Sequence, residues 1–202
     1  INNMKCSKEQ LQLRIKEAQD ILSQTLSKMP VKAFLLIMPS TQEIYLINDG
    51  KAELSYSIST SKYGLGNKNE SFQTPVGIHY IAKKIGHDIP RLTIFKGRKP
   101  LPGNLTLDDL NSDEQKKLRY EHFQEFDDVI TSRILWLKGC EEGINKGGDV
   151  DTYNRYIYIH GTAHEDKIGE TASHGCIRMN NNDIISLFDA VSENMIVLIL
   201  NN

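Results

Sequence analysis

The stretch Tyr156–Asn180, which reads YIYIHGTAHEDKIGETASHGCIRMN, decides most of what can be expected of this 202-residue chain. It holds three of the six histidines and one of the three cysteines. The apolar residues Tyr156–Ile159 predict a strand that delivers His160 at its end. Cys176 follows His160 by sixteen positions, a separation that two strands and their connection can bring together. We therefore expect a thiol beside an imidazole, held by strands.

A cysteine beside a histidine is typical of nucleophilic catalysis. The imidazole of His160 takes the proton of the Cys176 thiol, and the ion pair holds the thiolate at a pH below the free thiol pKa of about 8.5. Gly161 exposes a backbone carbonyl that can accept the second imidazole N–H, a task that a carboxylate performs in other triads. Gly175 permits a sharp turn that directs the N–H groups of Gly175 and Cys176 toward a developing oxyanion.

The motif around the cysteine resembles that of a known family. Ser173-His174-Gly175-Cys176 is followed by Ile177-Arg178 and preceded by the His160-Gly161 pair, and this pattern resembles the signature of the L,D-transpeptidases (YkuD-like). Upstream, Lys62–Gly77 resembles the glycine-rich and Thr-Pro-x-Gly segment of the same domain, through Gly64, Gly66, Thr74, Pro75 and Gly77. The resemblance covers most of Val31–Leu200.

The resemblance implies a two-step acyl transfer on peptidoglycan stem peptides, without a cofactor or a metal. Cys176 would attack the bond between the third and fourth stem residues and release D-Ala, and the side-chain amine of a second stem would then take the acyl group. His160 would act as the base and Gly161 would lend its carbonyl. The remaining implied roles are the lining of the nucleophile by Ser173, His174 and Gly175, and the binding of a substrate carboxylate by Arg178. Such an enzyme serves cell wall biogenesis and cell shape, and is a carbapenem target.

Other functions stay open at this point. An L,D-carboxypeptidase would send the same thioester to water, and a related hydrolase would release a wall-attached protein. A non-catalytic wall-binding module is a further alternative, which the intact Cys176, His160 and Gly161 disfavour. Zinc binding is suggested by His160, His164, His174 and Cys176, but His160 and His164 fall on a glycine-containing loop rather than on one face of a helix.

The rest of the chain predicts a mainly β domain with flanking helices, an L,D-transpeptidase-like β-sandwich. Residues 1–30 are expected to form a helical extension, with an amphipathic helix over Ser7–Met29 that is capped by Ser7 and Gln10. Residues 31–202 form the catalytic domain, with a helical insertion at about 105–130. Strands are expected over Ala33–Met38, Glu43–Ile47, Ala52–Ser59, Ile78–Ala82 and Met195–Leu200, a turn at Asn48–Gly50, and a helix cap within Asn180–Asn182, while Ser132–Lys138 is a further apolar run.

Composition and charge bear on the possible partners and on the location of the protein. The chain is 39% hydrophobic and 25% charged with a formal net charge of −2, which disfavours a nucleic-acid partner. Its apolar runs are far shorter than the roughly 20 residues that cross a bilayer. No secretory signal is visible, yet a peptidoglycan enzyme is expected to be exported to the periplasm or cell wall. Cys6 and Cys140 are either unrelated thiols or, in an oxidising compartment, a disulfide. The sequence predicts no oligomeric state.

Overall fold

A closed barrel of eight strands forms the centre of the molecule, for which a computed structural model describes residues 6–26, 31–122 and 128–201. Around the barrel the strands follow the order β1-β10-β4-β7-β8-β9-β3-β2. The pairs β1–β10 and β8–β9 are parallel and the others antiparallel. The strand bounds are β1 Ala33–Met38, β2 Glu43–Asn48, β3 Lys51–Ser59, β4 Gly77–Ile85, β7 Ile130–Gly139, β8 Tyr158–Thr162, β9 Ile177–Met179 and β10 Ile196–Ile199.

The core follows from the two-residue period of the strands. In β1, Leu35 and Ile37 belong to an apolar cluster to which all eight barrel strands contribute buried residues, whereas Phe34 and Leu36 belong to a second cluster. Successive side chains of a strand point to opposite faces, so both faces of β1 are covered. This double burial explains why β1 reads as a continuous apolar run.

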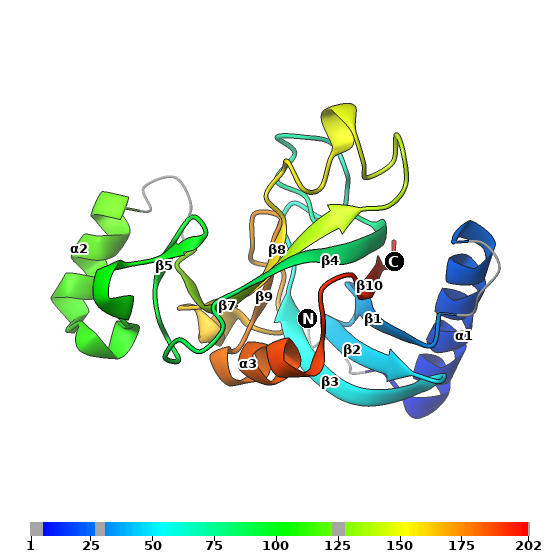
Figure 1. Ribbon diagram of the computed structural model, residues 1–202, viewed down its shortest axis with the longest axis horizontal. Coiled ribbons are helices and arrows are strands. Elements are labelled where there is room, and N and C mark those ends of the chain that lie inside the picture. The colour runs from blue at the N-terminus through cyan, green and yellow to red at the C-terminus, as the bar shows by residue number, and fades with distance from the viewer. Residues whose placement is uncertain (1–5, 27–30, 123–127, 202) are drawn as a thin grey trace.

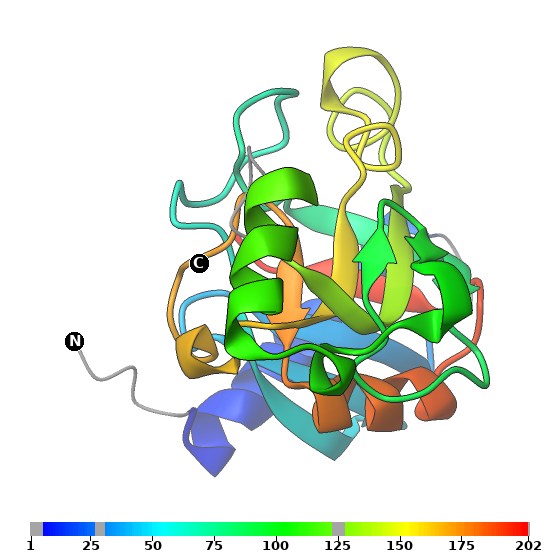
Figure 2. The same ribbon diagram turned by 90° about the vertical axis from the view of Figure 1, so that its left-hand side faces the viewer.

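Two different elements cover the two apolar clusters. Helix α3 (Asn181–Ala190) contributes Ile184, Leu187 and Phe188 to the first cluster, and helix α1 (Lys8–Thr25) contributes Ile15 and Leu22 to the second. Figure 1 shows α1 at one end of the molecule and helix α2 (Ser112–His122) at the opposite end, with the barrel between them. Figure 2 shows α2 in front of the barrel.

The segment between β4 and β7 carries the elements that the sequence did not resolve. A short hairpin is formed by β5 (Phe95–Lys96) and β6 (Lys99–Pro100), and Phe95 packs with Trp136 and Tyr158 on the outer face of β7 and β8. The same segment contains the single-turn helices η1 Pro102–Asn104 and η2 Leu107–Asp109. Two further single-turn helices follow later in the chain, η3 Gly148–Val150 after β7 and η4 Glu165–Lys167 after β8. Within the predicted insertion at 105–130, residues 123–127 lie outside the described part of the chain, and Ile130 already begins β7.

Most predicted elements are confirmed. The domain is mainly β with flanking helices, although hydrogen bonding continues around the whole sheet, so the two layers expected of a sandwich are joined into one barrel. Ser7 caps α1 with the expected capping box to Gln10. The hairpin between β2 and β3 turns at Asp49 and Gly50, both with positive φ, as its two-residue loop requires.

One local prediction is wrong, and the predicted cap of α3 is confirmed in position only. His160 does not end its strand, because β8 starts at Tyr158 and continues to Thr162, buried throughout. Tyr156 stands outside the strand with φ 57°. Asn180 occupies the N-cap position of α3, but its side chain makes no capping hydrogen bond. In the described ranges, no helix has the length and hydropathy needed to span a membrane.

Candidate active site

Strand parity gathers the candidate site on the outer face of β8 and β9. The two strands are parallel, with Ile159 opposite Ile177 and His160 opposite Arg178. The odd-numbered residues of both strands point into the barrel core. Because side chains alternate along a strand, the even-numbered residues Tyr158, His160 and Arg178 share the outer face, and Cys176, one residue before β9, lies on that face beside Tyr158.

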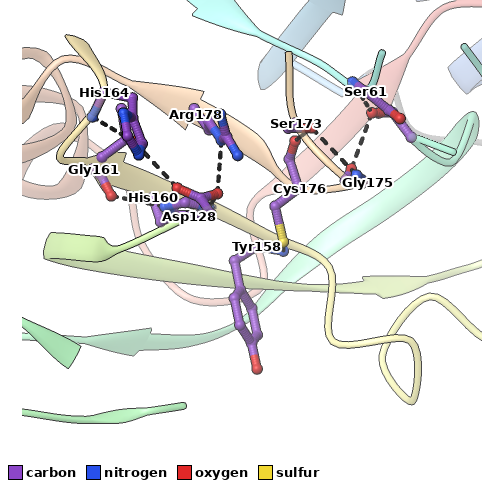
Figure 3. A network of polar contacts seen from close by, with 12 residues as sticks. Ser61, Asp128, Tyr158, His160, Gly161, His164, Ser173, Gly175, Cys176 and Arg178 are labelled. Carbon is purple, nitrogen blue, oxygen red and sulfur yellow. Dashed lines mark hydrogen bonds and ion pairs between the residues drawn. The ribbon is translucent and has the colours of Figure 1, made fainter. Parts of the chain in front are cut away.

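Backbone groups of the Tyr156–Tyr158 segment hold the thiol of Cys176. The Tyr158 N–H donates to Sγ over 3.3 Å, and Sγ lies 3.4 Å from the carbonyl oxygen of Tyr156. Figure 3 shows the backbone nitrogen of Tyr158 beside the sulfur and the Tyr158 ring pointing away from it. Cys6, Cys140 and Cys176 are all free thiols in the structure, and Cys176 is partly exposed. The two backbone contacts therefore fix the position of the sulfur on this face.

The His160 ring is fully buried and is oriented by its neighbour. Its Nδ1 lies 2.7 Å from the carbonyl oxygen of Gly161, the contact expected from the sequence. A side chain could not replace the hydrogen of Gly161, because a Cβ atom there would lie 2.5 Å from the backbone oxygen of Thr131 and 2.7 Å from Oδ1 of Asn181. The glycine is therefore required by close packing, and the carbonyl contact fixes the ring.

Asp128 is a candidate functional residue that the sequence analysis did not identify. Its Oδ2 lies 3.3 Å from Nε2 of His160 and accepts a 2.7 Å hydrogen bond from Nε of Arg178, while Thr162 Oγ1 donates to Oδ1 over 3.2 Å (Figure 3). Asp128 precedes β7, which pairs with β8, and this pairing brings it to His160. No sequence motif marks Asp128, because only the register of β7 on β8 brings its carboxylate to His160.

The buried charges at Asp128 change the protonation of His160. Burial acts to lower the pKa of His160, but the Asp128 carboxylate and a hydrogen bond to Cys176 outweigh it and raise this pKa from 6.5 to about 10. Burial acts to raise the pKa of Asp128, but His160 and Arg178 hold it well below its usual range. His160 is therefore an imidazolium at neutral pH, paired with a carboxylate and close to the thiol.

Arg178 and Gly175 make contacts that differ from those expected. Arg178 is buried and its Nε is engaged by Asp128, so the contact seen is internal, and the binding of a substrate carboxylate stays a prediction. The Gly175 N–H donates to Ser173 Oγ over 3.2 Å rather than pointing at an open position. The Gly175 N–H is thus already hydrogen-bonded, and the Cys176 N–H is the other expected oxyanion donor.

The Ser173–Cys176 turn is fixed from both sides. Ser173 Oγ donates to the carbonyl oxygen of Cys176 over 2.6 Å, and Gly175 adopts φ 123°, a conformation that L side chains rarely adopt. Thr74 Oγ1 donates to the Gly175 carbonyl over 3.0 Å and accepts the Ser61 N–H over 2.9 Å. The Thr-Pro-x-Gly segment thus holds the turn that carries Cys176.

His174 lies at the surface end of this turn, among exposed aromatic rings. Its ring centroid is 5.7 Å from that of Tyr63 and 6.3 Å from that of Phe72. Tyr63 and Phe72 are 49% and 42% exposed, which is unusual for rings of this size. His174 therefore belongs to an aromatic surface beside Cys176 and not to the buried charge network.

The zinc alternative has no geometric support. Nowhere in the described part of the chain do three His, Cys, Asp or Glu side chains converge as ligands of one metal ion would. His164 donates its backbone N–H to Thr162 Oγ1, while His174 lies in the aromatic surface.

The comparison with known sequences identifies the family. The profile described as "L,D-transpeptidase catalytic domain" matches residues 32–199, most of the chain. This protein belongs to the L,D-transpeptidase (YkuD) catalytic domain family. A similar relative is the Bacillus subtilis (strain 168) protein YqjB, provisionally named an L,D-transpeptidase, which is 25% identical over 171 residues, 85% of this chain and 73% of the relative.

Solved L,D-transpeptidases align with this chain at low sequence identity and with TM-scores below 0.5. L,D-transpeptidase 3 from Mycobacterium tuberculosis, solved with a faropenem-derived adduct, has a TM-score of 0.48 and 15% identity, with 85% of this chain and 61% of that chain covered. The catalytic domain of the E. faecium L,D-transpeptidase, solved acylated by ertapenem, has a TM-score of 0.47 and 16% identity, with 86% and 100% covered. This chain thus spans about three fifths of the mycobacterial chain's length, and the family assignment rests on the sequence profile.

Membership in the L,D-transpeptidase family explains the spacing of the motif. The profile match contains the His160-Gly161 pair and the Ser173–Cys176 turn, and the structure brings these segments together through the parallel pairing of β8 and β9. Asp128, which precedes β7, joins the same cluster through its ion pair with Arg178. Helix α1 lies before the matched residues and packs on the far side of the barrel from the site (Figure 1).

Proposed function

We propose that this protein is a peptidoglycan L,D-transpeptidase that uses Cys176 as its nucleophile. The observation that supports it most is the placement of one thiol, one imidazolium and one carboxylate on a single face, with His160 between the Gly161 carbonyl and Asp128. This arrangement supplies a nucleophile, a proton donor and a group that keeps the donor charged. The peptidoglycan stem tetrapeptide is the donor substrate implied by the family.

In the first step, the Cys176 thiolate attacks the carbonyl carbon of the third stem residue. The oxyanion that forms is stabilised by the Cys176 N–H, because the Gly175 N–H is engaged by Ser173. The bond from that carbon to the D-Ala nitrogen then breaks, and the imidazolium of His160 gives its proton to the leaving amine. The products of this step are free D-Ala and a thioester at Cys176.

In the second step, the side-chain amine of another stem attacks the thioester. Neutral His160 takes a proton from the attacking amine, the carbon–sulfur bond breaks, and the thiolate and imidazolium are restored. Asp128 lowers the cost of each return to the charged form, because a buried imidazolium is stabilised by an adjacent carboxylate. Arg178 acts through Asp128 and is a positioning residue.

The product masses test this proposal against the hydrolytic alternatives. We expect that the protein, incubated with disaccharide tetrapeptide, yields a cross-linked dimer that lacks one D-Ala, measured by mass spectrometry. Tripeptide alone at high donor concentration would assign the protein to the L,D-carboxypeptidases and leave the thioester step intact. Neither product, from a protein with a cooperative melting transition, would contradict the proposed function.

Acylation by a carbapenem provides a second, independent test. A solved member of the family carries ertapenem as a covalent acyl group, and a thiolate that forms a thioester with a stem peptide should open a β-lactam ring in the same way. We expect one ertapenem adduct per chain in the intact mass, located at Cys176 by peptide mapping. An adduct at Cys6 or Cys140, or none after prolonged incubation, would contradict the mechanism.

We also propose that the protein works outside the cytoplasmic membrane, because its proposed substrate lies there. Fractionation of cells that produce the full-length protein should place it in the periplasm or with the cell wall. Exclusive recovery with the cytoplasmic fraction would contradict this location.

A further inference from the structure

Arg98, at the tip of the β5–β6 hairpin, lies over aromatic side chains beside the nucleophile. Its guanidinium carbon is 4.8 Å from the ring centroid of Trp136 and 5.0 Å from that of Tyr156. Its Nη1 donates to the hydroxyl oxygen of Tyr158 over 3.2 Å. The side chain is exposed, so three contacts hold the position of a cation that solvent still reaches.

The aromatic side chains under Arg98 are held firmly. Trp136 is buried, stacks on Tyr153 with centroids 3.9 Å apart, and donates from Nε1 to the Tyr153 carbonyl over 3.1 Å. Tyr156 is 53% exposed and has a left-handed backbone, a conformation of some cost for a bulky residue. That backbone brings its carbonyl to the sulfur of Cys176 and leaves its ring outside, under Arg98.

The same two residues therefore connect the nucleophile to the cation. Tyr156 and Tyr158 contact Sγ of Cys176 through their backbones and Arg98 through their side chains. The guanidinium lies about one tyrosine side chain away from the thiol. In an extended peptide, one residue spans roughly 3.3–3.6 Å, so a group one or two residues from the scissile carbonyl can reach Arg98.

Arg98 also has unused capacity for an anion. A guanidinium has five N–H donors in a planar fork that matches a carboxylate, and the hydrogen bond to Tyr158 uses one of them. No carboxylate in the described ranges forms an ion pair with Arg98, whereas Arg178 is engaged by Asp128. Arg98 is thus a cation near Cys176 whose remaining donors are open to a substrate.

We propose that Arg98 binds the terminal carboxylate of the donor stem peptide. This inference rests on the proposed function, in which the bond to the last residue of the stem is broken. An enzyme that removes only the last residue has to recognise a chain end, and the chemical mark of that end is a free carboxylate one residue beyond the scissile carbonyl. Arg98 supplies the complementary charge on a rigid aromatic support and so determines specificity for the donor.

The test compares two donors: the tetrapeptide with a free terminal carboxylate, and the same peptide with a terminal carboxamide. We expect the wild-type protein to prefer the free acid at least about tenfold in kcat/KM, as the loss of one charged hydrogen-bonded pair implies. Arg98→Ala should lose most of this preference through a higher KM for the acid, with kcat/KM for the amide nearly unchanged. Arg98→Gln, which keeps most of the stem length, should behave like Arg98→Ala.

Lys83→Ala is the matched control, because Lys83 is an exposed cation 5.7 Å from the centroid of the same Trp136 ring but lies on β4, which pairs with β10 and β7 rather than with β8. It should keep the preference for the acid. An unchanged preference in Arg98→Ala, or an equal loss in Lys83→Ala, would overturn the inference. These outcomes are separate from failure of the proposed function, in which the wild-type protein would turn over neither donor and would take no ertapenem adduct.

Discussion

Replacing Cys176 by alanine is expected to abolish turnover of the stem tetrapeptide and to leave the fold intact. Without the thiol no thioester forms, and loss of a covalent nucleophile costs at least about 10⁴-fold in kcat. The side chain is partly exposed and lies on the outer face of the barrel, so its removal opens no cavity in the core. Product formation followed by mass, together with a thermal melting curve, measures both effects.

The matched control is Cys140→Ala, which removes a second free thiol far from the motif in sequence. It should retain wild-type turnover and wild-type acylation by ertapenem. His160→Gln should be as inactive as Cys176→Ala, because the two residues act as one unit. Turnover near the wild-type rate in a folded Cys176→Ala variant would refute the assignment of the nucleophile.

Replacing Asp128 by asparagine is expected to lower kcat/KM by about 10²–10³-fold at pH 7, within the range of general acid–base effects. The buried His160 then keeps the burial that lowers its pKa and loses the carboxylate that raises it, so it becomes neutral at pH 7. A neutral imidazole cannot protonate the leaving amine. Asp113→Asn removes an exposed carboxylate, 94% accessible, and should change kcat/KM little.

The pH dependence distinguishes this role of Asp128 from a merely structural one. In the wild-type protein the alkaline limb of kcat/KM should lie near the His160 pKa of about 10, and in Asp128→Asn it should move to lower pH. Because the folded pKa of His160 is above 6.5, the stability that its protonation contributes is complete below pH 6.5 and is lost as the pH rises through about 10. An alkaline limb at the same pH in both proteins would contradict the assignment.

The barrel strands could be predicted from the sequence because their apolar residues follow the burial of each strand. Ala33–Met38 is apolar throughout and has the bounds of β1, and Ser7 and Gln10 form the capping box that their spacing predicts. The motif predicted that Cys176, His160 and Gly161 lie close together, because the family it resembles brings these two segments to one site. These features are local or lie within one short segment.

The features that the sequence did not predict depend on contacts between distant segments. Asp128 meets His160 only through the register of β7 on β8, which shifts between Thr131 and Ile134. Arg98 lies in a hairpin of two-residue strands, too short for any periodicity to show. The engagement of the Gly175 N–H by Ser173 is a detail of turn geometry that the motif letters do not contain.

The alternation of side chains along β8 and β9 places residues with different roles at neighbouring positions. Odd-numbered residues in these strands pack in the barrel core, and even-numbered residues form the candidate site on the outer face. A substitution at Tyr158 or Arg178 therefore leaves the volume of the barrel interior unchanged. An insertion or deletion of one residue between Gly175 and Met179 would exchange the two sets and turn the charged side chain of Arg178 inward. A change in the length of this segment is therefore expected to dismantle the site, whereas a single substitution on the outer face keeps the register.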